Sequence, residues 1–278
     1  MSKSFVFDPQ SFKGMEHSGW ERNALFYDDV VSPTTPQAVG PLLDATGVGV
    51  GTRLLEVCCG PGYGAGAAIS RGAEAVGVDF AQAMVEVARK KYPKAAFQQG
   101  DAENLSFGDA SFDAAICSFG LLHLAEPEKA LAEAYRVLVP GGRYAFTVWC
   151  SPDKCKFFGL ILGAVQAHGN LDLPLPPAPP IFRFSDHNEC LAVLQRVGFV
   201  EPKVSEIPLV ASVPKTGDEQ ILDIIYKSTV RVRKILDLQT AEARERIHRA
   251  IVDGVAHFEK NGRIELPMPA VLASARKP

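Results

Sequence analysis

A glycine-rich turn follows a run of apolar residues at positions 54–57. Gly60, Gly62 and Ala65 have the spacing G-x-G-x-x-G/A, in which glycines let the backbone approach a nucleotide cofactor closely. Asp79 lies 19 residues beyond Gly60 and ends the next apolar run, where a carboxylate can accept hydrogen bonds from ribose hydroxyls. The pattern predicts a nucleoside-containing cofactor, and the glycines alone fit NAD as well as other cofactors of this kind.

The elements that must position these residues alternate between apolar runs and helical patterns, which predicts an α/β fold with a doubly wound, mostly parallel sheet. The strands predicted in this part of the chain are Arg53–Cys58, Ala75–Asp79, Ala95–Gln99, Phe112–Phe119 and Arg143–Trp149. The helices predicted between them are Ala65–Arg71, Ala81–Tyr92 and Glu128–Leu138, the last begun by Pro127 and ended by Pro140, Gly141 and Gly142.

Two helices are expected before this core. Ser18 and Glu21 have the spacing of a capping box ahead of a helix at Trp20–Val30, and Thr35 with Pro36 opens a second helix that runs to about Ala45.

Beyond Trp149 the alternation stops. The segment Leu173–Pro180 (LPLPPAPP) reads as an extended loop, because proline cannot continue a helix or a central strand. The elements expected after it are a helix at Ser185–Val197 ended by Gly198, a strand at Val204–Val210, helices within Ile221–Leu236 and Ala241–Phe258, and a last strand at Val271–Ala275. The sheet then has seven strands, with a helical cover inserted before the last one.

We expect one compact domain in three parts. These are an N-terminal helical cap (1–50), a cofactor-binding core (51–150), and a part (151–278) with the rest of the sheet, the proline-rich loop and a helical substrate cover.

Composition narrows the partners. The net charge of −3 gives no basic field for nucleic acid. The six cysteines form no C-x-x-C pair, so no metal site is predicted and a reducing compartment is favoured. No signal peptide and no run of about 20 apolar residues is found, so we expect a cytoplasmic location and no membrane span. We further expect a monomer or a homodimer.

Four blocks occur in an order typical of one family: LLEVCCGPGYGA, GVDFAQAMVEVARKKYP, QQGDAENLSFGDASFDAAICSFGLLHL and EKALAEAYRVLVPGGRYAFTVW. Over these blocks, from Arg53 to Trp149, the chain resembles class I S-adenosylmethionine-dependent methyltransferases, above all those of ubiquinone and menaquinone biosynthesis. The resemblance implies S-adenosylmethionine as cofactor, S-adenosylhomocysteine as product, and a small-molecule metabolite methylated on carbon or oxygen.

The resemblance also implies roles for single residues around the methionine and ribose parts of the cofactor. Glu56 lies beside the methionine moiety, with Gly60 and Gly62 under it, and Asp79 binds the ribose. Ser118 lies close to the sulfonium, and Tyr27 closes over the cofactor.

At the adenine ring the resemblance implies four further contacts. Phe80 and Met84 flank the ring, Asp101 accepts from its amino group, and the backbone amide of Ala102 contacts it. Carboxylates at 56, 79 and 101 suit a sulfonium cation, whereas an NAD enzyme would use the helix N-terminus for phosphate. Cys58 departs from the family, which usually has glycine there, and its thiol narrows the approach to the methionine portion.

His123 is the candidate general base, needed only if the accepting atom must lose a proton. The residues expected to line an apolar acceptor pocket are Trp20, Phe119, Phe157 and Phe182. Two other readings stay open, an NAD-dependent oxidoreductase and a non-catalytic binding module of the same fold.

Overall fold

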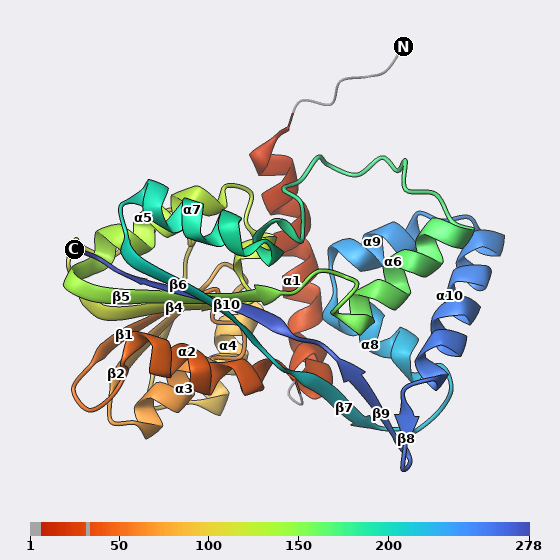
Figure 1. Cartoon of the computed structure of the whole chain (residues 1–278), viewed down its shortest axis with the longest axis horizontal. Coiled ribbons are helices and arrows are strands. Elements are labelled where there is room, and N and C mark those ends of the chain that lie inside the picture. The colour runs from red at the N-terminus through yellow and green to blue at the C-terminus, as the bar shows by residue number, and fades with distance from the viewer. Residues whose placement is uncertain (1–6, 32–33) are drawn as a thin grey trace.

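Seven strands form one sheet in the order β3-β2-β1-β4-β5-β10-β6 in this computed structural model, which describes residues 7–31 and 34–278 (Figure 1). The strands of this sheet are β1 (Arg53–Val57), β2 (Glu74–Asp79), β3 (Ala96–Gln99), β4 (Phe112–Ser118), β5 (Leu138–Trp149), β6 (Val200–Ile207) and β10 (Ala270–Arg276). Strands β1 to β5 pair in parallel, and β10 runs antiparallel to both β5 and β6. The predicted mostly parallel seven-stranded sheet is confirmed.

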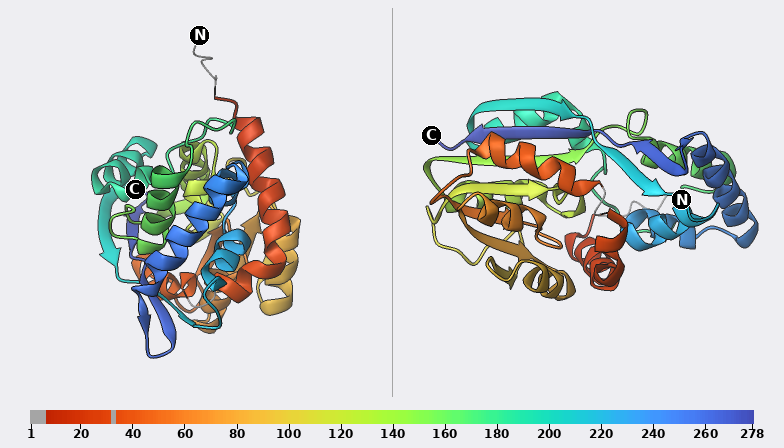
Figure 2. Two further views of the ribbon diagram at one scale, coloured as in Figure 1. Left: turned by 90° about the vertical axis from the view of Figure 1, so that its right-hand side faces the viewer. Right: turned by 90° about the horizontal axis from the view of Figure 1, so that it is seen from below.

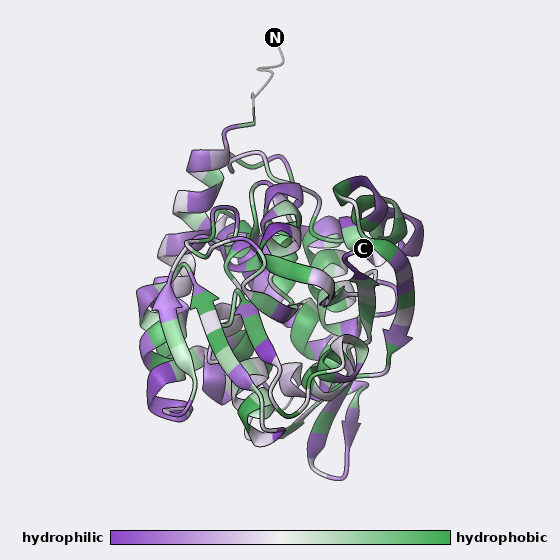
Figure 3. Cartoon of the chain, turned by 90° about the vertical axis from the view of Figure 1, so that its left-hand side faces the viewer, coloured by the Kyte–Doolittle hydropathy of each residue, from purple (hydrophilic) through white to green (hydrophobic). Residues whose placement is uncertain are grey.

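Helices cover both faces of the sheet because its strands are apolar on both sides. Leu54 packs in one cluster with residues of α2 (Val39–Thr46), α3 (Tyr63–Ser70) and α4 (Gln82–Lys91). Its neighbour Leu55 points to the opposite face, into a cluster with α5 (Pro127–Val137) and α7 (His187–Val197). In Figure 3 hydrophobic positions recur along these strands. The continuous apolar runs of the sequence therefore reflect burial on both faces.

The cover forms a second lobe beside the carboxyl ends of the strands (Figures 1 and 2). It contains α6 (Lys156–His168), α8 (Gln220–Ser228), α9 (Arg231–Asp237), α10 (Ala241–Ala256) and the small sheet β7-β9-β8. The strands of the small sheet are β7 (Val210–Pro214), β8 (Glu259–Lys260) and β9 (Arg263–Pro267). A helical cover before the last strand is therefore confirmed.

The prediction of one strand at Val204–Val210 was wrong at its end. Strand β6 stops at Ile207, and the chain leaves the large sheet at Pro208, which has no N–H to donate to a ladder. Val210 already belongs to β7, which pairs with β9. The sequence analysis missed β8 and β9 altogether.

The first helix is much longer than predicted. Helix α1 spans Pro9–Val31, so the start at Trp20 and the capping box were wrong. Asp8 caps α1 instead, because its carboxylate accepts from the amides of Gln10 and Ser11 at 3.1 and 3.3 Å. Ser18 lies inside the helix and its hydroxyl donates to the Gly14 carbonyl at 2.9 Å.

Other boundaries shift by a few residues. A 3₁₀ turn η1 (Thr35–Ala38) precedes α2, and another, η3 (Arg183–Ser185), precedes α7. The segment 173–180 contains neither helix nor strand, as its prolines predict. In the described ranges, 7–31 and 34–278, none of the helices has the length and apolar character needed to cross a bilayer.

Candidate active site

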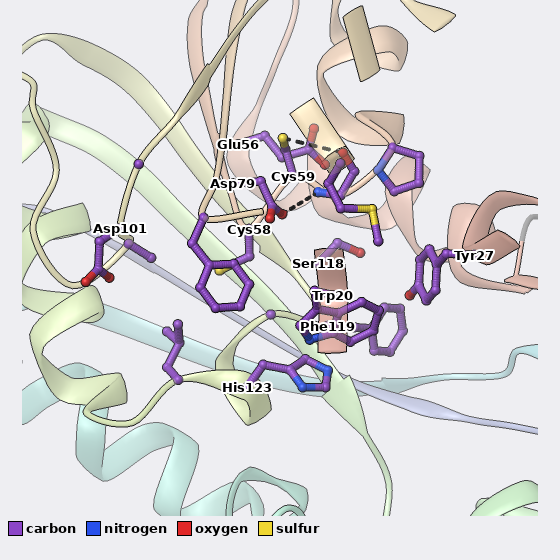
Figure 4. Close-up of a pocket in the computed structure, with 18 of the residues that line it drawn as sticks. Trp20, Tyr27, Glu56, Cys58, Cys59, Asp79, Asp101, Ser118, Phe119 and His123 are labelled. Atoms are coloured by element: carbon purple, nitrogen blue, oxygen red, sulfur yellow. Dashed lines mark hydrogen bonds between the residues drawn. The ribbon is translucent and has the colours of Figure 1, made fainter. Parts of the chain in front are cut away.

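A pocket of about 940 Å³ opens where β1, β2 and β4 end, the place at which open α/β sheets bind ligands. Figure 4 shows Asp101 and Tyr27 at opposite ends of this pocket, with Glu56 and Asp79 on one side and Phe119 and His123 on the other. We call it the cofactor pocket.

Glu56 is the last but one residue of β1 and is 2% exposed. Its two carboxylate oxygens accept from the amides of Gly64 at 3.0 Å and Ala65 at 2.8 Å, in the first turn of α3. Burial raises the pKa of Glu56 to about 7, although these two amides lower it. The carboxylate therefore occupies amides at the N-terminus of α3 that a dinucleotide enzyme would offer to a pyrophosphate.

Asp79 is the last residue of β2 and is 6% exposed. One of its oxygens accepts from the Gly60 amide at 2.8 Å, and the other accepts from the Ala81 amide at 3.0 Å. Burial raises the pKa of Asp79 to about 6, against the effect of the two amides. Since a carboxylate has about four lone-pair sites, each oxygen can still accept a hydroxyl from the pocket.

The turn between β1 and α3 has left-handed backbone at three positions. Gly60 and Gly62 have φ of 49° and 81°, and Cys58 has φ of 54°. A Cβ on Gly62 would lie 2.7 Å from the Phe97 ring, so Gly62 packs against the core and does not line the pocket. Cys58 thus adopts a conformation that favours glycine.

The Cys58 side chain lies against Gly120, just after β4. A Cβ on Gly120 would lie 2.5 Å from the Cβ of Cys58 and 2.7 Å from the Sγ of Cys117. Burial and the neighbouring Cys117 thiol raise the pKa of Cys58 well above its ordinary value, with the hydrogen bond to Cys117 as the largest cause. Cys58 is therefore accommodated by the missing side chain at 120.

The far end of the pocket carries the residues expected at the adenine ring. Phe80, Met84, Asp101 and Ala102 all line it. Asp101 is paired with Lys13 of α1 at 2.7 Å, a contact that the sequence analysis missed. Any group that reaches the Asp101 carboxylate from the pocket shares it with this ammonium group.

Helix α1 closes one side of the pocket by polar contacts to α4 and by aromatic side chains. Glu21 accepts from the amide of Ala83 at 3.3 Å and also from that of Gln82, at the start of α4. Trp20 and Tyr27 line the pocket and pack edge to face, with ring centroids 5.1 Å apart. Tyr27 is thus placed over the pocket.

His123 lies in the 3₁₀ turn η2 (Leu121–His123) and is held by Glu16 of α1. Nδ1 of His123 is 2.9 Å from Oε2 of Glu16, and that same oxygen accepts from Nε1 of Trp20 at 3.1 Å. Glu16 is 1% exposed. The sequence analysis missed Glu16, because it placed the start of the helix after this residue.

A second cavity of about 1020 Å³ adjoins the first and is walled mainly by apolar side chains from the cover. We call it the acceptor chamber. The two cavities share the residues Trp20, Tyr27, Thr35, Phe119 and His123. Phe119 stacks on Trp149, with ring centroids 4.0 Å apart, and so forms the floor between them.

The structure brings most of the predicted site residues together. Tyr27, Glu56, Gly60, Asp79, Ser118 and the four residues at the adenine end line the cofactor pocket, and Gly62 does not. Trp20, Phe119 and Phe157 line the chamber. Phe182 is not among the chamber-lining residues and packs behind the wall on Phe158, with ring centroids 5.5 Å apart.

The sheet order, the antiparallel β10 and the acidic residues at the ends of β1 and β2 define the class I methyltransferase fold. A methyltransferase domain family matches residues 55–146, which confirms the class over that part of the chain.

Demethylmenaquinone methyltransferases of several bacteria match part of the chain. The chain is 40% identical over 111 residues to the demethylmenaquinone methyltransferase of Paenarthrobacter aurescens, covering 40% of this chain and 44% of that one. It is 45% identical over 94 residues to that of Thermus thermophilus, covering 32% and 42%. The chain thus spans about half the length, or less, of these curated relatives.

Solved structures extend the similarity of fold. The YcgJ protein of Bacillus subtilis matches with a TM-score of 0.56 and 24% identity, covering 87% of this chain and 98% of that one. An S-adenosylmethionine-dependent methyltransferase of Thermotoga maritima matches with a TM-score of 0.55 and 20% identity, covering 95% and 100%. At these identities the likeness is one of fold.

Proposed function

We propose that this protein is an S-adenosylmethionine-dependent methyltransferase that acts on carbon or oxygen of a small-molecule metabolite. The observation that carries the proposal is a cofactor pocket with a carboxylate at the end of each of two strands, joined through a shared wall to an apolar chamber. The methyltransferase domain at 55–146 supports the same activity.

The chemistry of the pocket fits the cofactor. When bound, S-adenosylmethionine supplies a methyl group on a sulfonium cation, and it carries no phosphate. We propose that Asp79 receives the ribose hydroxyls and that Glu56 and Gly60 lie beside the methionine part. Ser118 and Tyr27 would flank the sulfonium. Phe80, Met84, Asp101 and Ala102 would surround the adenine ring.

A dinucleotide enzyme fits this geometry less well. The amides of Gly64 and Ala65 already donate to Glu56, so they do not face the pocket as donors for a pyrophosphate. A carboxylate in that position would also repel phosphate oxygens.

The shared wall is where a methyl acceptor would meet the cofactor. Methyl transfer is an in-line displacement, for which most of the rate comes from holding the reacting atoms in line in a dry site. Phe119 and Trp20 would exclude water there. Thr35 is 7% exposed and its hydroxyl is a buried group without a hydrogen-bond partner among the described residues, so it can hold a polar atom of the acceptor.

We propose that His123 removes the proton when the acceptor must lose one. Glu16 holds Nδ1, which leaves Nε2 as the basic nitrogen once the proton resides on Nδ1. Glu16 is then a positioning residue that fixes the tautomer and the ring orientation, as the carboxylate does in other carboxylate–histidine pairs.

The experiment has two arms. Calorimetric titration with S-adenosylhomocysteine and with NAD is expected to show micromolar binding of the first only, and binding of NAD alone would end the proposal. Turnover of methyl-labelled cofactor against a metabolite extract then identifies the acceptor. His123→Ala is expected to lower that turnover about 100-fold or more while S-adenosylhomocysteine still binds.

We also propose three parts along the chain: residues 1–50 as a helical cap, 51–150 as the cofactor-binding core, and 151–278 as the rest of the sheet with the proline-rich loop and the substrate cover. A cytoplasmic location is supported by six cysteines that are all free.

A further inference from the structure

Arg231 is the first residue of α9 and lines the acceptor chamber. It is the only lysine or arginine among the described residues that form this cavity. The surrounding walls are aromatic and aliphatic, from residues such as Trp149, Phe157, Ile221 and Ile264. A single cationic group therefore faces a cavity that is otherwise mainly apolar.

The guanidinium group has few partners in the protein. Its Nη1 donates to the backbone carbonyl of Pro179 at 3.0 Å. Across residues 7–31 and 34–278, no carboxylate lies within 4.0 Å of Arg231, although most other arginines of the chain form such pairs. A guanidinium has five N–H donors, so one neutral acceptor leaves most of its capacity unused.

The other charged groups of the chamber do not satisfy Arg231. Glu16 is the only carboxylate among the described residues that line the chamber, and it attracts Arg231 only from beyond ion-pair distance. Its Oε2 already accepts from Trp20 and from His123, on the side of the cofactor pocket. Arg231 is half-buried, and burial lowers the pKa of its guanidinium group below the ordinary value.

A poorly compensated cation in apolar surroundings is unfavourable until an anion joins it. The planar fork of arginine suits two oxygens of one carboxylate or phosphate group, and such charge-assisted pairs are stronger than neutral hydrogen bonds.

We propose that the acceptor chamber binds an amphipathic molecule whose anionic oxygen group, a carboxylate or a phosphate, pairs with Arg231. Its apolar body would lie against the aromatic and aliphatic walls, and its reacting end would reach the wall shared with the cofactor pocket. This inference rests on the proposed function, since it assigns a ligand class to the cavity in which the methyl acceptor would bind.

The two tryptophans of the chain, Trp20 and Trp149, both line the chamber, so their fluorescence reports its occupancy directly. Four probes with the same ten-carbon chain are titrated below their micelle concentrations: decanol, decanoate, decyl phosphate and decyltrimethylammonium. Decanoate or decyl phosphate is expected to bind at least tenfold more tightly than decanol, and the ammonium probe most weakly. The ratio of the two anions tells which head group the site prefers. Equal affinity for decanol and both anions would overturn the proposal.

Arg231→Gln removes the charge and keeps a donor for the Pro179 carbonyl. This variant is expected to bind decanol as the unsubstituted protein does and to lose the tenfold preference for anions. Arg233→Met is the matched control, because Arg233 lies on the same helix and does not line the chamber. It is expected to retain the preference.

Two other results would contradict the proposal. A preference for anions that survives in Arg231→Gln would place the anion elsewhere, and a loss of decanol binding would show that Arg231 only fastens the loop at Pro179. Calorimetry with S-adenosylhomocysteine separates this inference from the proposed function. A protein that binds the product and does not distinguish the probes refutes the anion site alone, whereas failure to bind the product refutes the methyltransferase.

Discussion

The cofactor pocket and the acceptor chamber share a wall, yet they are assembled in different ways. The pocket is built mostly at the ends of adjacent parallel strands. Its carboxylates at 56 and 79 accept from backbone amides in the turn after β1, in the first turn of α3 and just after β2. The chamber is built mainly from α1, η1, α6, Ile181 just after the proline-rich loop, α8, α9 and the small sheet, which are far apart in sequence.

This difference separates a fixed half from a variable half of the site. Strand ends in a parallel sheet have few ways to be arranged, so the pocket is constrained by the fold itself. Side chains of the chamber are constrained mainly by packing with their neighbours, so they can be exchanged without disturbing the sheet. If the two halves are independent, a substitution in one of them leaves ligand binding in the other unchanged.

The largest expected effect comes from Asp79→Ala. The variant loses the acceptor proposed for two ribose hydroxyls, and charge-assisted hydrogen bonds of this kind contribute about 1.5–3 kcal/mol. Affinity for S-adenosylhomocysteine is expected to fall at least about tenfold by calorimetry, while binding of decanol in the chamber stays unchanged. An unaltered affinity would show that the ribose lies elsewhere, and a parallel loss of decanol binding would show that the two halves are coupled.

Gly120→Ala tests how tightly the turn after β4 is packed against the turn after β1. The added Cβ would lie 2.5 Å from Cys58 and 2.7 Å from Cys117, so one of them must move. We expect the free energy of unfolding to fall by about 1–3 kcal/mol, measured by urea denaturation. Gly49→Ala is the control, because its Cβ would meet no atom within 4 Å. Equal stability of the two variants would mean that the thiols have room to relax.

Cys58 offers a smaller and cleaner test of backbone strain. Replacing it with glycine or with alanine removes the thiol in both cases, and the two variants differ only by a Cβ at a φ of 54°. Because that conformation disfavours any side chain, Cys58→Gly is expected to be about 1 kcal/mol more stable than Cys58→Ala in urea denaturation. If alanine proved as stable as glycine, the turn would not be strained at this position.

The smallest expected effect is that of pH on the cofactor pocket. Burial raises the pKa of Asp79 to about 6 in the free protein, so the group gains a proton as the pH falls through 6. If the ligand requires the ionised form, affinity for S-adenosylhomocysteine is expected to fall about fourfold between pH 7.5 and 5.5. Glu56, whose pKa is raised to about 7, also gains a proton in this range, so Asp79→Asn should reduce the dependence to the part that Glu56 contributes. A dependence that is unchanged in the variant would show that ionisation of Asp79 does not govern binding.

The same contrast explains what the sequence could predict. The strands at 53–57, 74–79 and 112–118 were located within one residue of their ends, because strands buried on both faces read as continuous apolar runs. Asp79 was found with them because it ends its run, whereas the role of Glu56 was implied by the resemblance to methyltransferases. Their hydrogen bonds to the turn amides carry no pattern of their own and could not be predicted.

Glu16 and Lys13 were missed for a local reason. The capping-box spacing at Ser18 favoured a helix start at Trp20, whereas α1 starts at Pro9, so about half of the helix was not predicted. The hairpin β8–β9 was missed because its strands are short and their partner, β7, lies some 50 residues earlier. No sequence pattern marked Arg231 as a binding residue, because the role proposed for it depends on a cavity that only the folded chain creates.

The two hydrogen bonds between Glu56 and the first turn of α3 also bear on how this protein could be redesigned. Gly60, Gly62 and Ala65 already have the spacing of a dinucleotide-binding turn, so the loop itself would need little change. The Glu56 carboxylate, however, already accepts hydrogen bonds from the two backbone amides that an incoming phosphate would need. To convert this protein to a nicotinamide cofactor, a designer would first have to replace Glu56 and so free these amides. Other substitutions for phosphate binding would take effect only after that one.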